Sequence, residues 1–186
     1  LTSLGGDLGF NDNENLQVMS FTVLESIGGS LVINNNDALV STSGLTSLKY
    51  IGQNVLFSSN AVLETLDALA NIKQLAGGDL TVTNNTLLKK ADGLSWLTDV
   101  SGSFTLSGNP QLSQCNMSNL TSVGSELSIT DNQTIELLVM NSLKSVGGMM
   151  DISSNPSLKS LNMPKLKSVS EKMTIHSHVL LNELQL

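Results

Sequence analysis

Hydrophobic and polar residues alternate in short runs that recur along the whole chain. Each run has the form Leu-x-Ile or a close equivalent, as in Leu31-Val32-Ile33 and Leu127-Ser128-Ile129. Such alternation places two apolar side chains on one face of a strand and the middle residue on the other. No window keeps helical spacing over two turns. The pattern therefore predicts short strands joined by corners.

An asparagine follows each strand and indexes a repeat of 23 to 25 residues. The clearest copies read close to Gly-Gly-x-Leu-x-Ile-x-x-Asn-x-x-Leu. The index positions are Asn13, Asn36, Asn60, Asn85, Asn109, Asn132, Asn155 and His178. A register held over so many copies indicates a repeat architecture and not an accident of composition.

A single repeat cannot bury its own apolar columns, whereas stacked repeats pair identical positions into parallel sheets around a continuous core. The pattern therefore predicts an all-β fold, a parallel β-solenoid of about eight rungs that spans residues 1–186 as one unit. The index asparagines are expected to form an internal ladder at one corner, donating and accepting along the stack. His178 is expected to substitute as a local acceptor or to cap the ladder.

The repeat continues to both ends of the chain without a cap. Residues 1–4 match the segment before a later corner, and Leu184 and Leu186 occupy columns of an unfinished rung. An uncapped solenoid exposes core and an unpaired sheet edge. We therefore expect a segment of a longer protein, or end-to-end self-association.

The charge balance excludes partners that need a basic surface. The chain carries nine lysines, no arginine and sixteen acidic residues, with a net charge of −7. No cationic surface is expected to neutralise nucleic-acid phosphates or anionic lipids. The longest apolar runs, such as residues 137–140, are far shorter than a membrane span. Neither nucleic-acid binding nor direct membrane insertion is expected.

The reactive side chains do not gather into a catalytic or metal-binding set. Cys115, the only cysteine, shares an apolar column with Leu138 and Leu161 and is expected to be a core residue. His176 and His178 form a His-x-His pair with no third ligand nearby. The acids scatter over several columns, unlike the clustered carboxylates of solenoids that cleave polysaccharides. We expect no enzyme activity, no metal and no cofactor.

One outward strand face is rich in short hydroxyl side chains. These residues are Thr81, Thr83, Thr105, Ser107, Ser128, Thr130, Ser153 and Thr174. Such rows can match a lattice, as in ice-binding solenoids, although short hydroxylated residues also suit any exposed strand. The first three rungs do not continue the array. Binding to ice or another crystal surface is therefore kept as an alternative function.

Four Asn-x-Ser/Thr sequons occur, at Asn84, Asn116, Asn119 and Asn132. Asn132 belongs to the predicted ladder and should be buried, which argues against its modification. Asn84, Asn116 and Asn119 fall at outward or corner positions and are candidates for N-glycosylation. Sequons arise by chance in a chain rich in asparagine and serine, so they give secretion modest support.

The repeat resembles the receptor L-domain family. The likeness is carried by the Gly-x-Leu-x-Ile-x-x-Asn-x-x-Leu blocks and by corners such as Ser-Gly-Asn-Pro-Gln-Leu at residues 107–112. Members of this family are leucine-rich right-handed β-helices in the ectodomains of the insulin and epidermal growth factor receptors. The related repeats of fungal GPI-anchored cell-wall glycoproteins look even more similar. The resemblance covers essentially the whole chain and implies a right-handed solenoid that is extracellular or at the cell surface.

The resemblance does not identify a ligand, because ligand choice in such folds depends on surface residues that no motif records. We expect a non-enzymatic extracellular module, secreted or anchored through a further segment, whose rigid scaffold contacts protein or glycan at a cell surface, wall or filament. A ligand-binding receptor ectodomain is a second alternative. A tight receptor site would be expected to carry tryptophan and arginine. The single tryptophan, Trp96, is expected at an exposed position between Leu94 and Leu97.

Overall fold

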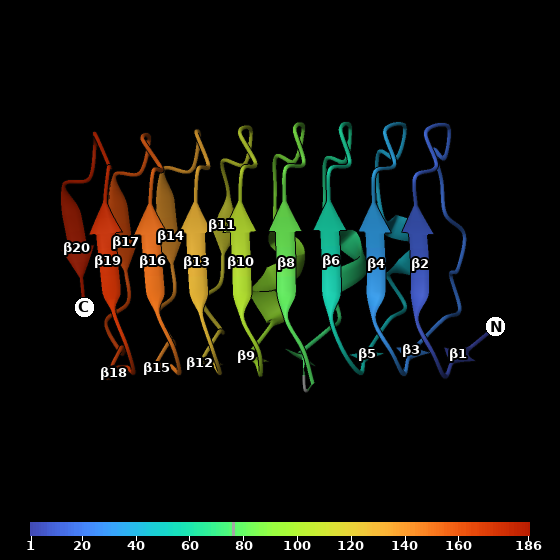
Figure 1. The fold of residues 1–186 in the computed structure, drawn as a ribbon, viewed down its shortest axis with the longest axis horizontal. Helices are drawn as coiled ribbons and strands as arrows, with labels where there is room; N and C mark the ends of the chain where they lie inside the picture. Colours follow the sequence, from blue (N-terminus) through green and yellow to red (C-terminus); the bar gives the residue numbers. More distant parts are fainter. Residues whose placement is uncertain (76) are drawn as a thin grey trace.

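The chain coils into rungs that stack along one axis. The computed structural model describes residues 1–75 and 77–186. The strands of one face stand side by side in Figure 1, from β2 at the N-terminal end to β19 near the C-terminal end. Every strand pairing in this part of the chain is parallel, and successive rungs pair position by position (for example Phe104 with Leu127). The predicted all-β solenoid of about eight rungs is confirmed.

The first face is an eight-stranded sheet with four residues in each strand. Its strands are β2 (Leu8–Asn11), β4 (Leu31–Asn34), β6 (Val55–Ser58), β8 (Leu80–Thr83), β10 (Phe104–Ser107), β13 (Leu127–Thr130), β16 (Met150–Ser153) and β19 (Met173–His176). In the inner rungs the first and third residues of each strand are buried, as Leu127 and Ile129 are in β13. The second and fourth residues face outward, as the alternation predicts.

The second face is built from strands of two residues, which form a three-stranded and a five-stranded sheet. The first comprises β1 (Ser3–Leu4), β3 (Ser26–Ile27) and β5 (Tyr50–Ile51). The second comprises β7 (Gln74–Leu75), β9 (Asp99–Val100), β12 (Ser122–Val123), β15 (Ser145–Val146) and β18 (Ser168–Val169). Each inner strand buries its second residue and turns its first residue outward.

The third face changes its structure part-way along the stack. Three 3-10 helices cover it first, η1 (Ser43–Leu45), η2 (Asp67–Leu69) and η3 (Asp92–Trp96). The later rungs carry strands, β11 (Cys115–Asn116), β14 (Leu137–Val139), β17 (Ser160–Asn162) and β20 (Glu183–Gln185). The prediction of strands alone is therefore wrong for the three rungs with helices.

The spacing of buried residues explains this change. In the rungs with helices the buried side chains are three positions apart, as Leu66 and Leu69 are, which is one turn of a 3-10 helix. In the rungs with strands they are two positions apart, as Cys115 and Met117 are, which is the period of a strand. One additional residue between the two buried positions thus converts a strand into a helical turn.

A ladder of asparagines closes the core at one corner. Its six inner members are fully buried, namely Asn36, Asn60, Asn85, Asn109, Asn132 and Asn155. The Nδ2 of Asn109 donates to the carbonyl oxygens of Val82 and Ser107, at 3.0 and 3.1 Å, and to Oδ1 of Asn132 at 3.3 Å. The Oδ1 of Asn109 accepts the backbone N–H of Asn85 at 3.1 Å. The amide of Asn109 thereby bonds groups of its own rung and of both neighbours, so that buried backbone groups at the corner stay paired.

The ladder ends on a histidine whose role differs in part from the expectation. The ring nitrogens of His178 lie 3.1 Å from the carbonyl oxygen of Asn155 and 3.0 Å from that of Ile152. Ile152 stands to His178 as Val82 stands to Asn109, since each is the third residue of the first-sheet strand one rung earlier. Because carbonyl oxygens only accept, the ring replaces the donor of an asparagine. Of the two expected roles of His178, the acceptor is therefore wrong, whereas its position at the end of the ladder fits the cap.

Candidate functional site

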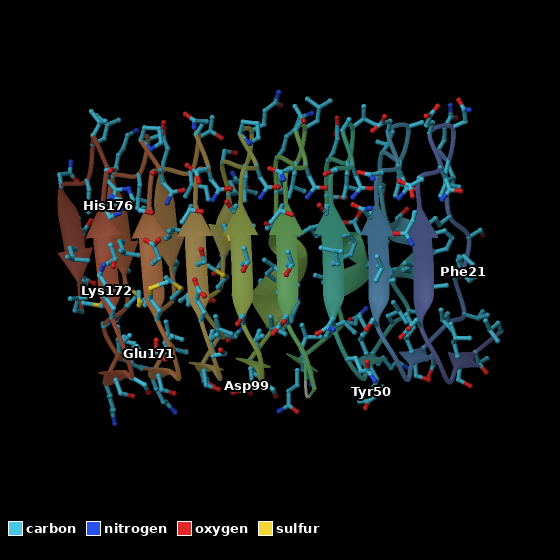
Figure 2. All side chains as sticks on the ribbon, viewed as in Figure 1. Phe21, Tyr50, Asp99, Glu171, Lys172 and His176 are labelled. Carbon is cyan, nitrogen blue, oxygen red and sulfur yellow. The ribbon has the colours of Figure 1, made fainter. Side chains whose placement is uncertain are left out.

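The eight hydroxyl residues singled out in the sequence lie on the outward side of the first sheet, but Ser153 is buried there, so the expectation that it belongs to an exposed face is wrong. The strand register aligns them in two columns. Column A contains Thr81, Thr105, Ser128 and Thr174, and column B contains Thr83, Ser107, Thr130 and Ser153. Asp151 interrupts column A, and His176, labelled in Figure 2, follows Ser153 in column B.

The two columns differ in how far their hydroxyl groups are already used. In column B the hydroxyl of Thr83 donates to Ser58 at 3.2 Å, and those of Ser107 and Thr130 lie 2.8 Å apart. In column A the hydroxyls of Thr81, Thr105 and Ser128 make no hydrogen bond to another residue in the described part of the chain. Column A therefore offers the hydroxyl groups that an external ligand could bond.

Asp151 is an unusual member of column A. It stands between Ser128 and Thr174 on neighbouring strands. Its Oδ1 is buried and has no hydrogen-bond partner among the described residues. A buried acceptor without a donor costs free energy of folding. Asp151 is thus the position of column A at which the side chain lowers the stability of the fold.

The four sequons occupy different environments. Asn132 is a fully buried ladder residue. Asn119 is exposed, but its Nδ2 donates to the carbonyl oxygen of Ser95 at 2.7 Å. Asn116 is exposed on β11, and its Oδ1 accepts the N–H of Ser118 at 3.0 Å, which leaves Nδ2 unused by the described residues. Asn84 is exposed at a corner, where its φ is 57°.

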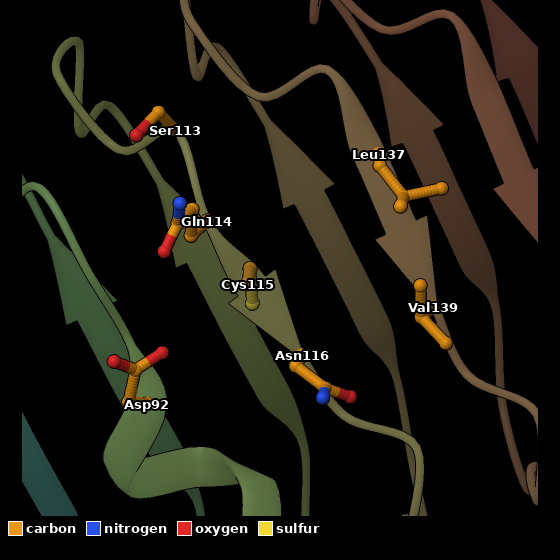
Figure 3. Close-up of a pocket in the computed structure, with 7 residues that line it drawn as sticks. All are labelled: Asp92, Ser113, Gln114, Cys115, Asn116, Leu137 and Val139. Carbon is orange, nitrogen blue, oxygen red and sulfur yellow. The ribbon is translucent and has the colours of Figure 1, made fainter.

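A hollow lies where the third face changes from helix to strand. It has a volume of about 380 Å³ and is lined by Asp92, Ser113, Gln114, Cys115, Asn116, Leu137 and Val139. Figure 3 shows Asp92 on η3 on one side of the hollow and the side chains of β11 and β14 on the other. Sequence reasoning missed this feature. Its only signal was the change in spacing between the rungs of Ala91 and Cys115.

Cys115 does not make this hollow reactive. The side chain is buried, and burial together with the nearby carboxylate of Asp92 raises the pKa of its thiol to about 12. The nucleophile is the thiolate, which is therefore scarce at neutral pH. The residue behaves as a small apolar member of the core.

Two kinds of feature are absent from residues 1–75 and 77–186. No group of three or more His, Cys, Asp or Glu side chains is arranged there to hold a metal ion. The helices described are short 3-10 turns, and none could cross a lipid bilayer.

Comparison with protein families decides the relationship of the chain. The model of the receptor L domain matches residues 2–97, which is half of the chain and comprises the rungs with 3-10 helices. The chain belongs to the receptor L-domain family. The sequence resemblance to receptor L domains is thereby confirmed. No solved structure matches the chain.

Receptor L domains are a non-catalytic kind of module. They occur in the extracellular parts of receptors, where they contribute to the binding of ligands. The residues that follow the matched stretch keep the same repeat and the same first sheet. The first sheet therefore runs from the matched half of the chain into the other half, whereas the hydroxyl residues of column A begin at Thr81 and lie mainly in the second half.

Proposed function

We propose that the chain is a non-enzymatic extracellular recognition module, a stiff solenoid that presents side chains for contact with protein or glycan. The observation that carries this proposal is the alignment of outward polar side chains in column A of a receptor L domain. Hydroxyls that the fold itself does not bond are available to a partner. Ligands are recognised by such site residues, whereas the fold alone does not specify them.

The stiffness of the scaffold supports this role. The asparagine ladder and parallel sheets link each rung to the next, and 43 hydrophobic residues form one core cluster along the stack. A partner that binds column A would meet side chains in fixed positions, so that little ordering entropy opposes binding.

The proposal is tested on the protein purified from its natural source. Intact-mass measurement with and without a glycosidase, followed by peptide mapping, should show secretory processing and N-glycans at Asn116 or Asn84. Asn132 serves as the internal control, because its amide is buried in the ladder and should be unmodified. A product without secretory processing and without glycan would contradict the extracellular assignment.

Ice or crystal-surface binding is a second candidate function. It is favoured by the register that aligns Thr81, Thr105 and Ser128 on three neighbouring strands. In that case the protein should show thermal hysteresis, and replacing Thr105 with lysine should abolish it. The matched control replaces Lys144 with threonine on the second face. Absence of thermal hysteresis in the wild-type protein would remove this candidate and leave the recognition module untouched.

A further inference from the structure

The only tyrosine and the only tryptophan of the chain are both exposed on the edge between the second and third faces. Tyr50, at the start of β5, is 49% exposed, and Trp96, at the end of η3, is 60% exposed. Figure 2 shows Tyr50 at the edge of the molecule, away from the first sheet. By contrast, Phe57 and Phe104 are fully buried. The two exposed rings therefore contribute little to the core.

Two hollows lie beside these rings. The first has a volume of about 360 Å³ and is lined by Lys49, Tyr50, Lys73, Gln74 and Thr98. The second has a volume of about 210 Å³ and is lined by Ala70, Asn71, Lys73 and Trp96. Lys73 lines both hollows and thus stands between the two aromatic residues. Tyr50, Lys73 and Trp96 come from three successive rungs, so the rings lie about 10 Å apart along the axis.

At this edge Lys49 and Lys73 lie near Glu25 and near Asp99, whose carboxylate accepts hydrogen bonds from the hydroxyls of Thr121 and Ser122. The chain has a net charge of −7. Lys49 is paired with Glu25 at 3.0 Å. Lys73 is exposed and has no ion-pair partner in the part of the chain that the structure describes. An uncompensated cation between two apolar rings is complementary to an acidic group flanked by apolar groups.

We infer that Tyr50, Lys73 and Trp96 form a docking edge for a protein segment that presents a carboxylate between two bulky apolar side chains. The apolar side chains enter the two hollows, and the carboxylate pairs with Lys73. An extended segment of three to four residues spans about 10 Å, the separation of the rings along the axis. Exposed tryptophan and tyrosine are the residue types that contribute most to protein interfaces. The inference extends the proposed recognition role to an edge that shares no residue with columns A and B.

The test uses a phage-displayed library of random linear peptides. Peptides that bind the immobilised protein are selected, and their binding to variants of the protein is then measured. Enriched peptides should carry glutamate or aspartate between apolar residues. As the chain has a single tryptophan, its fluorescence reports binding at this edge directly. The selected peptide should shift the emission of Trp96, and the same peptide with glutamine in place of glutamate should bind about tenfold more weakly.

Variants distinguish this edge from other surfaces. Lys73→Glu and Trp96→Ala should each weaken the selected peptide about tenfold or more. Lys144→Glu is the matched control, because Lys144 occupies the same column three rungs later and should leave binding unchanged. Equal binding to Lys73→Glu and the wild type, or a Trp96 shift produced by neutral oligosaccharides and not by peptides, would overturn the inference. Thr105→Lys should leave peptide binding unchanged. This variant alters column A, so a loss of the proposed function of column A can be told apart from a loss of binding at the docking edge.

Discussion

At the scale of single residues, the position of a side chain in the ladder decides its contribution to stability more than its residue type does. Asn84 and Asn85 are adjacent and chemically identical, yet Asn84 is exposed and Asn85 is fully buried. The amide of Asn85 bonds the carbonyl oxygens of Phe57 and Thr83 and also Oδ1 of Asn109. The pair therefore allows a matched comparison.

Asn85→Ala should lower the free energy of unfolding by about 3 kcal/mol, because several buried backbone groups lose their partners at once. The measurement is urea denaturation followed by circular dichroism. Asn84→Gly is the control, since it replaces an exposed residue at positive φ with one that favours that conformation. It should change stability by less than about 1 kcal/mol. Equal losses in the two variants would contradict the ladder account.

Asp151→Ser should raise the free energy of unfolding by about 1 kcal/mol, because a buried acceptor without a donor is removed. Asp37→Ser controls for the change in net charge, since Asp37 is an exposed corner residue. Thermal unfolding of both variants is the measurement. A lower stability of Asp151→Ser would show that the carboxylate has a stabilising contact.

The raised pKa of Cys115 predicts a specific loss of stability in alkaline solution. Burial raises the pKa of the thiol in the folded state to about 12, whereas the ordinary pKa of an exposed thiol is 9.0. The stabilising contribution is therefore complete below pH 9.0 and is lost as the pH rises towards 12. Cys115→Val should show a shallower decline of unfolding midpoint over this range. Identical pH profiles would contradict the buried-thiol assignment.

At the scale of the elements, the two sides of one strand respond oppositely to the same change. Leu127→Glu on β13 places an unpaired charge in the core and should prevent the native fold, because such a charge costs several kcal/mol. Ser128→Glu, on the next residue, points outward and should leave the fold intact. Circular dichroism and size-exclusion chromatography of the two variants test this difference. A folded Leu127→Glu protein would contradict the strand assignment.

Strands in which apolar and polar residues alternate strictly could be predicted from the sequence. The 3-10 helices, which accommodate one extra residue between two buried positions, could not. The alternation at residues 127–130 and the index position Asn132 directly predict a strand and a corner. The extra residue between Leu66 and Leu69 predicts that the next buried position moves by one column. The 3-10 turn that forms at Asp67–Leu69 depends on packing against the preceding rung. The hollow beside Asp92 arises only where a helical rung stacks on a strand rung.

The residues that surround Tyr50, Lys73 and Trp96 could not be predicted from the sequence for a related reason. These residues lie 23 positions apart, and the hollows beside them are lined by residues from neighbouring rungs. Exposure of Trp96 could be predicted from its place between two core leucines. Its neighbours could not, since a periodic pattern fixes columns and leaves the shape of the corners open.

At the scale of the whole molecule, each rung contacts chiefly its neighbours, so the molecule behaves as a one-dimensional stack with long, straight surfaces. Column A is such a surface, and it runs from Thr81 to Thr174 with Asp151 in place of one hydroxyl residue. The central claim is that a receptor L domain uses this surface to contact an extracellular partner.

Site-specific photo-crosslinking in living cells tests that claim most directly. A photoreactive amino acid in place of Thr105, in the middle of column A, should form a covalent adduct with a protein or glycan outside the cell. The same amino acid in place of Ser125, an exposed corner residue, should form none. No adduct from position 105, or adducts with cytosolic proteins alone, would contradict the account.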